Sequence, residues 1–300
     1  MTDPRVVYLL SALGVFLVIF LVAWYRLGRP QSEDDKGPPT LVHLGLGFVI
    51  NFFDTLGIGS FAPTTAMYRL LKLVPDEKIP GTLNIGHTIP TIAQAFIFIQ
   101  LVQVEFKTLV LLIGASILGA WIGAGVVAGW ARRTIQIGMG FALLVAALLF
   151  TLTNLGIVAG GGEAVALTGS RLALGIVGNF ILGAFMTLGI GLYGPSLIMI
   201  SALGMNPKAA FPIMMGSCAF LMVVAGIRFL RAGAYRLRAA LGLAIGGVPA
   251  ALIAALLVKS LNLVTMRWLV AIVVLYTAIT LLRSAMQEGA KETAKAEAKA

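Results

Sequence analysis

The sequence predicts an all-α integral membrane protein: an N-terminal span, then two inverted repeats, each a broken, re-entrant helical hairpin followed by three transmembrane helices. The first observation is composition, since 59% of the 300 residues are hydrophobic and only 11% are charged, against about 25% charged in soluble domains. A chain of this length cannot bury so much apolar surface in its own core, so lipid must be the solvent. The other two observations are an internal duplication and the distribution of basic residues.

Net charge and cysteine content narrow the function classes. The net charge of +10 comes from Lys and Arg in short clusters between apolar runs, as expected for loops that face anionic lipid rather than for a nucleic-acid interface. Cys218 is the only cysteine, which excludes an internal disulfide, a CxxC redox pair and a thiolate metal cluster. We therefore expect no cofactor, no metal and no nucleic-acid partner.

The N-terminal domain, residues 1–29, is expected to be a retained transmembrane helix. Residues 6–25 are apolar and long enough to cross a bilayer. Arg26 and Arg29 follow this run, no basic cluster precedes it, and no small-residue cleavage site follows, so a signal peptide is disfavoured. A polar linker at 30–40 separates this helix from the rest, and residues 285–300 form a charged tail.

An internal duplication follows the linker. When the sequence is shifted by 132 residues, 48–80 and 180–212 align without a gap, with 12 of 33 positions identical, including the run Thr-Leu-Gly-Ile-Gly and three prolines. Three apolar runs of span length follow each copy. The predicted spans are 80–103, 107–130 and 134–154 in the first copy and 209–228, 237–258 and 264–283 in the second. The sequence thus divides into repeat 1 at 41–154, a Gly-rich connecting loop at 155–170 and repeat 2 at 171–284.

Each duplicated segment is interrupted in its middle, whereas a single span needs about 20 continuous apolar residues. Glycine weakens a helix interior and proline interrupts or begins one, so each segment is predicted to form two short helices joined by a turn. Pro63 and Pro195 are expected at the first helical position after each turn. The breaking residues are Gly57, Gly59 and Pro63 in the first copy and Gly189, Gly191, Gly194 and Pro195 in the second.

Basic residues predict the topology. If each broken segment enters and leaves on the same side, 16 of the 22 Lys and Arg residues fall on one face; if each crosses fully, the split is 13 to 9. The positive-inside rule favours the re-entrant hairpin. It predicts a multi-pass protein of the cell (inner or plasma) membrane with its N-terminus outside and its C-terminus cytoplasmic. Three crossings per repeat is an odd number, so the halves would be inverted, as in many secondary transporters.

The two turns form the expected anion site. Glycine-rich turns at membrane depth leave backbone N–H groups free, and each turn opens a helix whose N-terminus carries roughly half a positive elementary charge. Two such ends meeting at mid-membrane would attract an anion without a buried Lys or Arg. The alternative is that the glycines serve close helix packing and that the hydroxyls bond to nearby carbonyls. The predicted substrate-binding residues are Thr55, Gly57, Ile58, Gly59, Ser60, Thr64, Thr187, Gly189, Ile190, Gly191 and Ser196.

Polar side chains near the first turn are candidates for a coupling path. Asp54 is the one acidic residue placed inside an apolar segment, and its counterpart after the shift is Met186. An intramembrane carboxylate is a candidate proton or cation partner; alternatively, Asp54 caps a half-helix or pairs with Arg69 or His87. The following span carries polar residues at three- and four-residue spacing, so they share a helix face that should point to the bundle interior. With Asp54, the predicted polar path comprises Asn84, His87 and Gln94.

The duplicated segments resemble those of the sulfite exporter TauE/SafE family, in which each of two halves opens with a broken helix of G-x-G-I-G-G type. Ser60 and Leu192 stand where the family often has a further glycine, and the resemblance covers most of residues 41–283, leaving out the first span and the acidic linker. It implies transport of sulfur-containing anions such as sulfite, thiosulfate or sulfonates, coupled to protons in some members. The matching positions are Gly57, Ile58, Gly59 and Pro63, and Gly189, Ile190, Gly191 and Pro195.

The favoured function is secondary transport of a small anion rather than catalysis. A sulfur-containing oxyanion (sulfite, thiosulfate or organosulfonate) and coupling to protons follow from the resemblance. A passive anion channel is the alternative, since inverted repeats also suit channels. An intramembrane serine hydrolase built on Ser60 and His87 is disfavoured, because the duplicated feature is the glycine frame and Leu192 stands opposite Ser60. The expected partners are the anionic substrate and membrane lipid, and the oligomeric state is left open.

Overall fold

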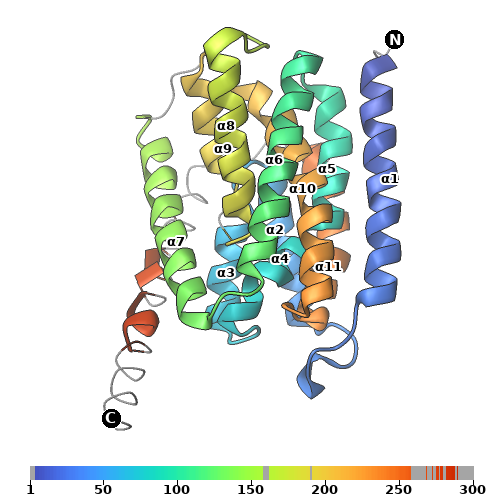
Figure 1. Ribbon diagram of the computed structural model, residues 1–300, viewed down its shortest axis with the longest axis vertical. Coiled ribbons are helices and arrows are strands. Elements are labelled where there is room, and N and C mark those ends of the chain that lie inside the picture. Colours follow the sequence, from blue (N-terminus) through green and yellow to red (C-terminus); the bar gives the residue numbers. More distant parts are fainter. Residues whose placement is uncertain are drawn as a thin grey trace.

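A computed structural model describes residues 4–157, 162–189 and 191–257, together with Trp268, Ile272, Leu275, Tyr276, Ala278, Ile279, residues 282–287 and Gly289. Its described secondary structure is helical apart from one isolated bridge between Ala164 and Met205. Among the described residues, six helices are long and apolar enough to cross a membrane, which confirms the predicted all-α membrane class (Figure 1). They are α1 (Pro4–Leu27), α6 (Phe106–Val127), α7 (Arg132–Asn154), α8 (Gly169–Met186), α10 (Ala210–Ala232) and α11 (Leu237–Leu257).

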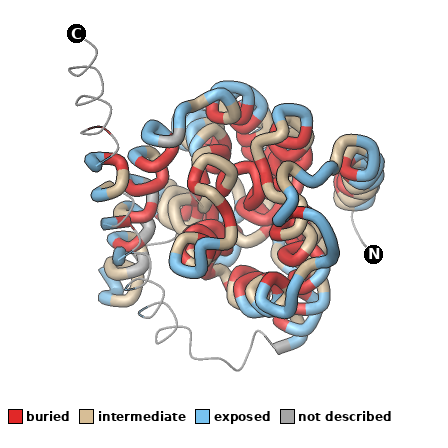
Figure 2. Tube along the Cα trace, turned by 90° about the horizontal axis from the view of Figure 1, so that it is seen from below, coloured by how far each residue is buried: buried red, intermediate tan, exposed pale blue. Residues whose placement is uncertain are grey.

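Helix α1 lies at the edge of the bundle and α10 at its centre. Only 17% of the apolar window of α1 is buried, against 83% for α10, so most of α1 is left for lipid. Its buried residues, among them Leu13 and Phe20, face α10 and α5 (Thr88–Leu101). In Figure 2 the buried stretches of the trace lie mainly toward the interior of the bundle and the exposed stretches toward its outside.

The two duplicated segments are each broken into two helices, as predicted. The first forms α2 (Leu41–Thr55) and α3 (Phe61–Leu70), and the second forms α8 and α9 (Tyr193–Ala202). Gly57 and Gly59 both have φ of +90°, a conformation that residues with a Cβ rarely adopt. The position predicted for the prolines was wrong by two residues, because Pro63 and Pro195 are each third in their helix. The first four N–H groups of a helix have no intrahelical acceptor, so a proline fits anywhere in that turn.

The span predicted at 80–103 is interrupted. It forms α4 (Ile79–Gly86) and α5, with His87 ending the first and preceding the second. Pro90 explains the interruption, because it has no N–H to donate to the carbonyl of Gly86. Most of the last predicted span, 264–283, and most of the tail lie outside the described residues, as does 158–161 of the connecting loop.

Two helix pairs make the closest packing. Helix α2 packs along α11, and α6 packs along α8. Glycines allow the approach: a Cβ on Gly47 would collide with the carbonyl oxygen of Gly242, and one on Gly119 would collide with that of Phe180. Close contact of this kind is how helices associate in lipid, where no hydrophobic force drives them together.

The loops gather at two ends of the bundle. At one, which we call the linker end, Tyr235 accepts a hydrogen bond from the Arg29 backbone N–H, and the Asp35 carboxylate accepts from the backbone N–H groups of Leu237 and Arg238. Here the 30–40 linker, the loop after α3 and the start of α11 lie together. At the other, the far end, the Glu105 N–H donates to the carbonyl of Val165. Figure 1 shows the N-terminus of α1 and the start of α8 at the far end and the linker at the opposite end.

Candidate functional site

The two glycine turns meet inside the bundle. A Cβ built on Gly59 would lie 3.6 Å from the Cβ of Tyr193, and one built on Gly191 would lie 3.6 Å from the Cβ of Phe61. These two contacts are related by the 132-residue shift of the duplication. The first residues of α3 and α9 therefore contact the opposite turn in the same way.

Two small cavities lie between the turns. One, of about 30 Å³, is lined by residues that include Ile58, Gly59, Gly191 and Pro195. The other, of about 10 Å³, reaches Asp54 and Ser60. Cavities of this size hold about one water molecule, whereas sulfite has four heavy atoms. The structure is thus closed around the turns, and an anion can enter only after they separate.

A hydrogen-bonded chain joins the first turn to the second. The Tyr193 hydroxyl donates to Gln94 Oε1 at 2.6 Å, and Gln94 Nε2 donates to Asp54 Oδ2 at 2.9 Å and to the Thr55 hydroxyl at 3.0 Å. All four side chains are buried. Ser60 lies beside the carboxylate, but no hydrogen bond of normal geometry reaches Asp54 Oδ1. Among the described residues, Asp54 Oδ1 therefore has no hydrogen-bond partner of normal geometry, and the Asp54 side chain lines the smaller cavity.

A second polar group surrounds His87. Its Nε2 lies 2.9 Å from the Thr64 hydroxyl, and its Nδ1 lies 2.9 Å from Asn51 Oδ1. The Asn51 amide is oriented by donation from Nδ2 to the Gly47 carbonyl, so Nδ1 of His87 must be the donor in its pair. In the neutral ring Nε2 is then an acceptor, and the one proton of the Thr64 hydroxyl can reach either Nε2 or the Ser60 carbonyl. His87 is fully buried and links α2, α3 and the α4–α5 junction.

Within the described part of the chain, the Asp54 carboxylate pairs with neither Arg69 nor His87. It bonds to Gln94, while Arg69 forms an ion pair with Asp76 at 2.8 Å and His87 contacts Thr64. Because the two ring nitrogens of His87 bond to Thr64 and Asn51, the serine–histidine pair of a hydrolase is not formed at Ser60. Among the described residues no group of three or more His, Cys, Asp or Glu could hold a metal ion.

The remaining described residues among those predicted for the site do not line the two cavities. Gly57 packs against the Phe211 ring and Gly189 near Leu83 and Met139, while the Thr187 hydroxyl donates to the Ala184 carbonyl. Asn84 donates to the carbonyl of Pro80, and the buried Ser196 hydroxyl has no partner in the part of the chain that the structure describes. Thr55 and Thr64 bond to main-chain carbonyls as well as to the polar chain. Ile190 lies outside the described residues.

Several residues beside the cavities were not among the predicted site residues. Phe61 and Tyr193 follow the two turns at equivalent positions, and Thr91, Met186 and Cys218 line the smaller cavity. The aligned aromatic pair was the available signal, because it repeats in register with the glycines. No sequence pattern predicted the contact between Tyr193 and Gln94, since 99 residues separate the two.

Comparison with known protein families gives one match. The family model described as "Sulfite exporter TauE/SafE" matches residues 1–150 and 170–300, which confirms the resemblance drawn from the turns. Because the match begins at residue 1, the expectation that the first span and the linker lie outside it was wrong. No curated protein and no solved structure matches the chain.

Proposed function

Since the chain belongs to the sulfite exporter TauE/SafE family, a family of membrane transporters of sulfur anions, we propose that it is a secondary transporter that binds a small sulfur oxyanion between its two glycine turns. The observation that carries the proposal is the meeting of the turns: Gly59 against Tyr193 and Gly191 against Phe61. Each turn opens a ten-residue helix, so two helix N-termini and their free N–H groups converge on one point.

The proposal includes an inverted relation between the halves. Each hairpin's first helix packs on a helix of the other half, α2 on α11 and α8 on α6, and the 132-residue shift maps the first pair onto the second. Helix α2 starts at the linker end and α8 at the far end (Figure 1). The two hairpins therefore enter from opposite ends and point their turns at the same depth, which supports a site reached from either side.

Asp54 is proposed as the proton-coupling group. Its carboxylate is 1% exposed, it accepts a hydrogen bond from Gln94, and no ion pair joins it to a Lys or Arg among the described residues. An uncompensated carboxylate deep in a membrane is expensive, so the protonated form is favoured when the turns are closed. When protonated, Oδ1 would donate a hydrogen bond to the anion. The proton would then leave Asp54 and cross the membrane with the anion. Met186 at the equivalent position makes this a property of the first half alone.

We propose the linker end as cytoplasmic. The described basic residues of this end outnumber those of the far end, which include Lys107, Arg171 and Lys208, and positive charge marks the inner side. The linker-end residues include Arg29, Lys36, Arg69, Lys72, Lys78, Arg236 and Arg238. The N-terminus would then lie outside a cell membrane, and the C-terminus inside.

Flux in proteoliposomes tests the proposed function. We expect saturable movement of sulfite that responds to an imposed pH gradient, and its loss in Gly59→Leu and Gly191→Leu, because these side chains would fill the cavities between the turns. Gly114→Leu is the matched control, since a Cβ on Gly114 meets nothing within 4 Å. Flux that rises linearly with concentration and ignores the pH gradient would favour a passive channel. Full activity of both turn variants would remove the turns from the site.

A further inference from the structure

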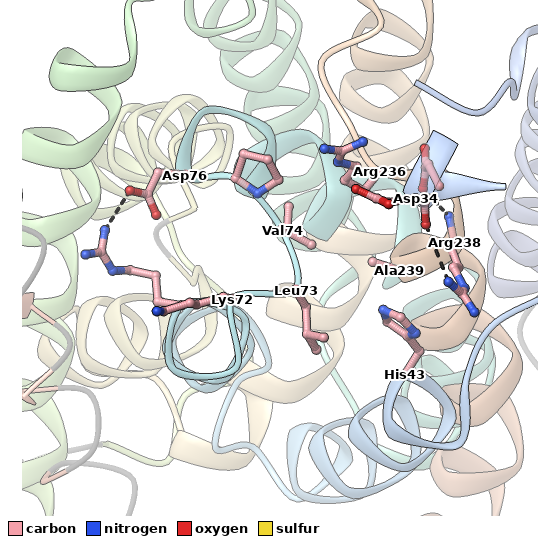
Figure 3. A pocket seen from close by; sticks show the side chains of 12 residues that line it. Asp34, His43, Lys72, Leu73, Val74, Asp76, Arg236, Arg238 and Ala239 are labelled. Atoms are coloured by element: carbon pink, nitrogen blue, oxygen red, sulfur yellow. Dashed lines mark hydrogen bonds and ion pairs between the residues drawn. The ribbon is translucent and has the colours of Figure 1, made fainter. Parts of the chain in front are cut away.

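A polar pocket of about 620 Å³ lies at the linker end, separate from the glycine turns. The end of α3, the start of α2, the start of α11 and the linker form its walls. In Figure 3, Lys72 and Asp76 stand on one side of the pocket, and Arg236, Arg238 and Asp34 stand on the other. The pocket is large enough for an oxyanion with several of its waters.

Two of the carboxylates that line the pocket, those of Asp35 and Asp76, already have hydrogen-bond or ion-pair partners. Asp76 pairs with Arg69 at 2.8 Å and also accepts from Gln136 at 2.9 Å. Asp35 accepts hydrogen bonds from the backbone N–H groups of Leu237 and Arg238, so its negative charge stabilises the N-terminus of α11. The exposed Asp34 is the third carboxylate of the lining, so three Asp side chains stand against four Arg and Lys side chains, which are Arg69, Lys72, Arg236 and Arg238.

Three cations around the pocket have no carboxylate partner among the described residues. Arg236 bonds to the Ser32 hydroxyl and Arg238 to the carbonyl of Pro38, both neutral acceptors. Neither they nor Lys72 takes part in an ion pair. The pocket therefore carries an excess of positive charge that an anion would neutralise.

The backbone at Lys72 gives an independent indication. Lys72 has φ of 52° and is the one non-glycine residue with positive φ in the described part of the chain. Its counterpart after the 132-residue shift is Gly204, with φ of 88°. Both end a helix where the chain turns left-handed, a conformation that favours glycine. A lysine here has a conformational cost that the fold does not require, which indicates a use for its ammonium group.

The pocket lies on the path toward the turns. Helix α3 runs from the first turn to the pocket, about 15 Å for its ten residues. Between them, the fully buried Tyr68 donates to the carbonyl of Ala239, a residue that lines the pocket. In this structure the pocket and the turns are thus separated by a closed contact between α3 and α11.

We propose that this pocket is a second anion site, which collects a small oxyanion at the linker end before it reaches the turns. The ligand class is a free anion with one or two negative charges, held by Lys72, Arg236 and Arg238. This inference rests on the proposed transport function. A phospholipid headgroup offers the same phosphate chemistry, and a binding measurement in lipid of defined charge separates it from a free anion.

The test compares Lys72→Gly and Arg236→Gln with the control Lys36→Gln, which removes a charge of the same end outside the pocket, where Lys36 pairs with the exposed Glu33. Lys72→Gly suits the left-handed backbone, so the fold is retained. We expect each pocket variant to raise the half-saturating sulfite concentration about threefold, with an unchanged maximal rate. Raising the salt from about 20 mM to about 200 mM should shrink this difference by screening. Equal half-saturation in all variants would overturn the proposal.

A binding measurement separates failure of this site from failure of the proposed function. Sulfite and inorganic phosphate should each raise the thermal unfolding midpoint of the full chain in uncharged phosphatidylcholine nanodiscs. The rise should persist in Gly59→Leu, which fills the turn region, and be lost in the double variant Lys72→Gly/Arg236→Gln. If sulfite is not transported but this pattern holds, the transport proposal fails and the anion site stands. Stabilisation that appears only with anionic phospholipid would overturn the free-anion site.

Discussion

Alanine substitutions at Gly59 and Gly194 form a matched pair that isolates the backbone geometry of the first turn. An added Cβ would have its nearest neighbour at 3.6 Å on Gly59 and at 3.9 Å on Gly194, both ordinary contacts. The two glycines differ in backbone conformation, since Gly59 has φ of +90° whereas Gly194 lies within helix α9. Steric room is thus similar, and conformational strain distinguishes the two substitutions.

The expected magnitude follows from that difference. A residue with a Cβ in a sparsely populated positive-φ conformation costs on the order of 1–3 kcal/mol, so Gly59→Ala should destabilise the protein by about this amount. Gly194→Ala should leave the unfolding free energy unchanged or raise it by up to about 1 kcal/mol, because alanine is the better helix former. The first half already has alanine there, since Ala62 is the counterpart of Gly194 after the 132-residue shift.

Unfolding by sodium dodecyl sulfate in mixed micelles, followed by circular dichroism, measures both variants against the unmodified protein. Gly189→Ala is a useful third member, since its φ of +87° predicts a cost like that of Gly59→Ala. Equal stabilities of the Gly59 and Gly194 variants would refute the reasoning, because the strain would then lie elsewhere than in the first turn.

Three further predictions concern single side chains. Tyr193→Phe removes the 2.6 Å hydrogen bond to Gln94 and leaves a buried amide oxygen unpaired. The free energy of unfolding in the same assay should therefore fall by about 1–3 kcal/mol. An unchanged unfolding midpoint would mean that this bond does not stabilise the closed turns. Asp54→Asn should abolish the response of sulfite flux to a pH gradient while sulfite still binds, and a flux that still follows the gradient would exclude Asp54 as the proton carrier. Glu105 caps α6, and the hydrogen bonds that it accepts from Thr108 lower its pKa below the ordinary 4.5. The ionised cap therefore stabilises the fold fully above pH 4.5, and this stabilisation is lost as the pH falls through the lowered pKa. Glu105→Ala should therefore cost about 1 kcal/mol at pH 7 and nothing in strong acid, and a gap independent of pH would contradict the cap.

Much of the fold followed from local features of the chain. Apolar length predicted α1, α6, α7, α10 and α11 to within a few residues, because a helix in lipid must satisfy its own backbone and be long enough to cross. The Thr-Leu-Gly-Ile-Gly runs predicted the two breaks, since glycine alone accepts the left-handed turn. The interruption at His87 was missed: Pro90 breaks one bond of the helix without stopping it, which a hydropathy pattern does not register.

The candidate site depended on contacts between distant parts of the chain. The duplication indicated that two turns exist, but their meeting across Phe61 and Tyr193 follows from the packing of α2 on α11 and of α8 on α6. The side-chain partner of Asp54 was likewise missed, since the sequence suggested Arg69 or His87 and the structure shows Gln94.

The sequence by itself determined that this is a duplicated, helical membrane protein with two kinked segments, because hydropathy, glycine and proline act over a few neighbouring residues. Tertiary structure alone decided which polar groups share a cavity, that the turns are closed, and that Lys72 and Arg236 face one pocket. Such contacts join residues from 23 to more than a hundred positions apart, and their free energy exists only once the helices have packed.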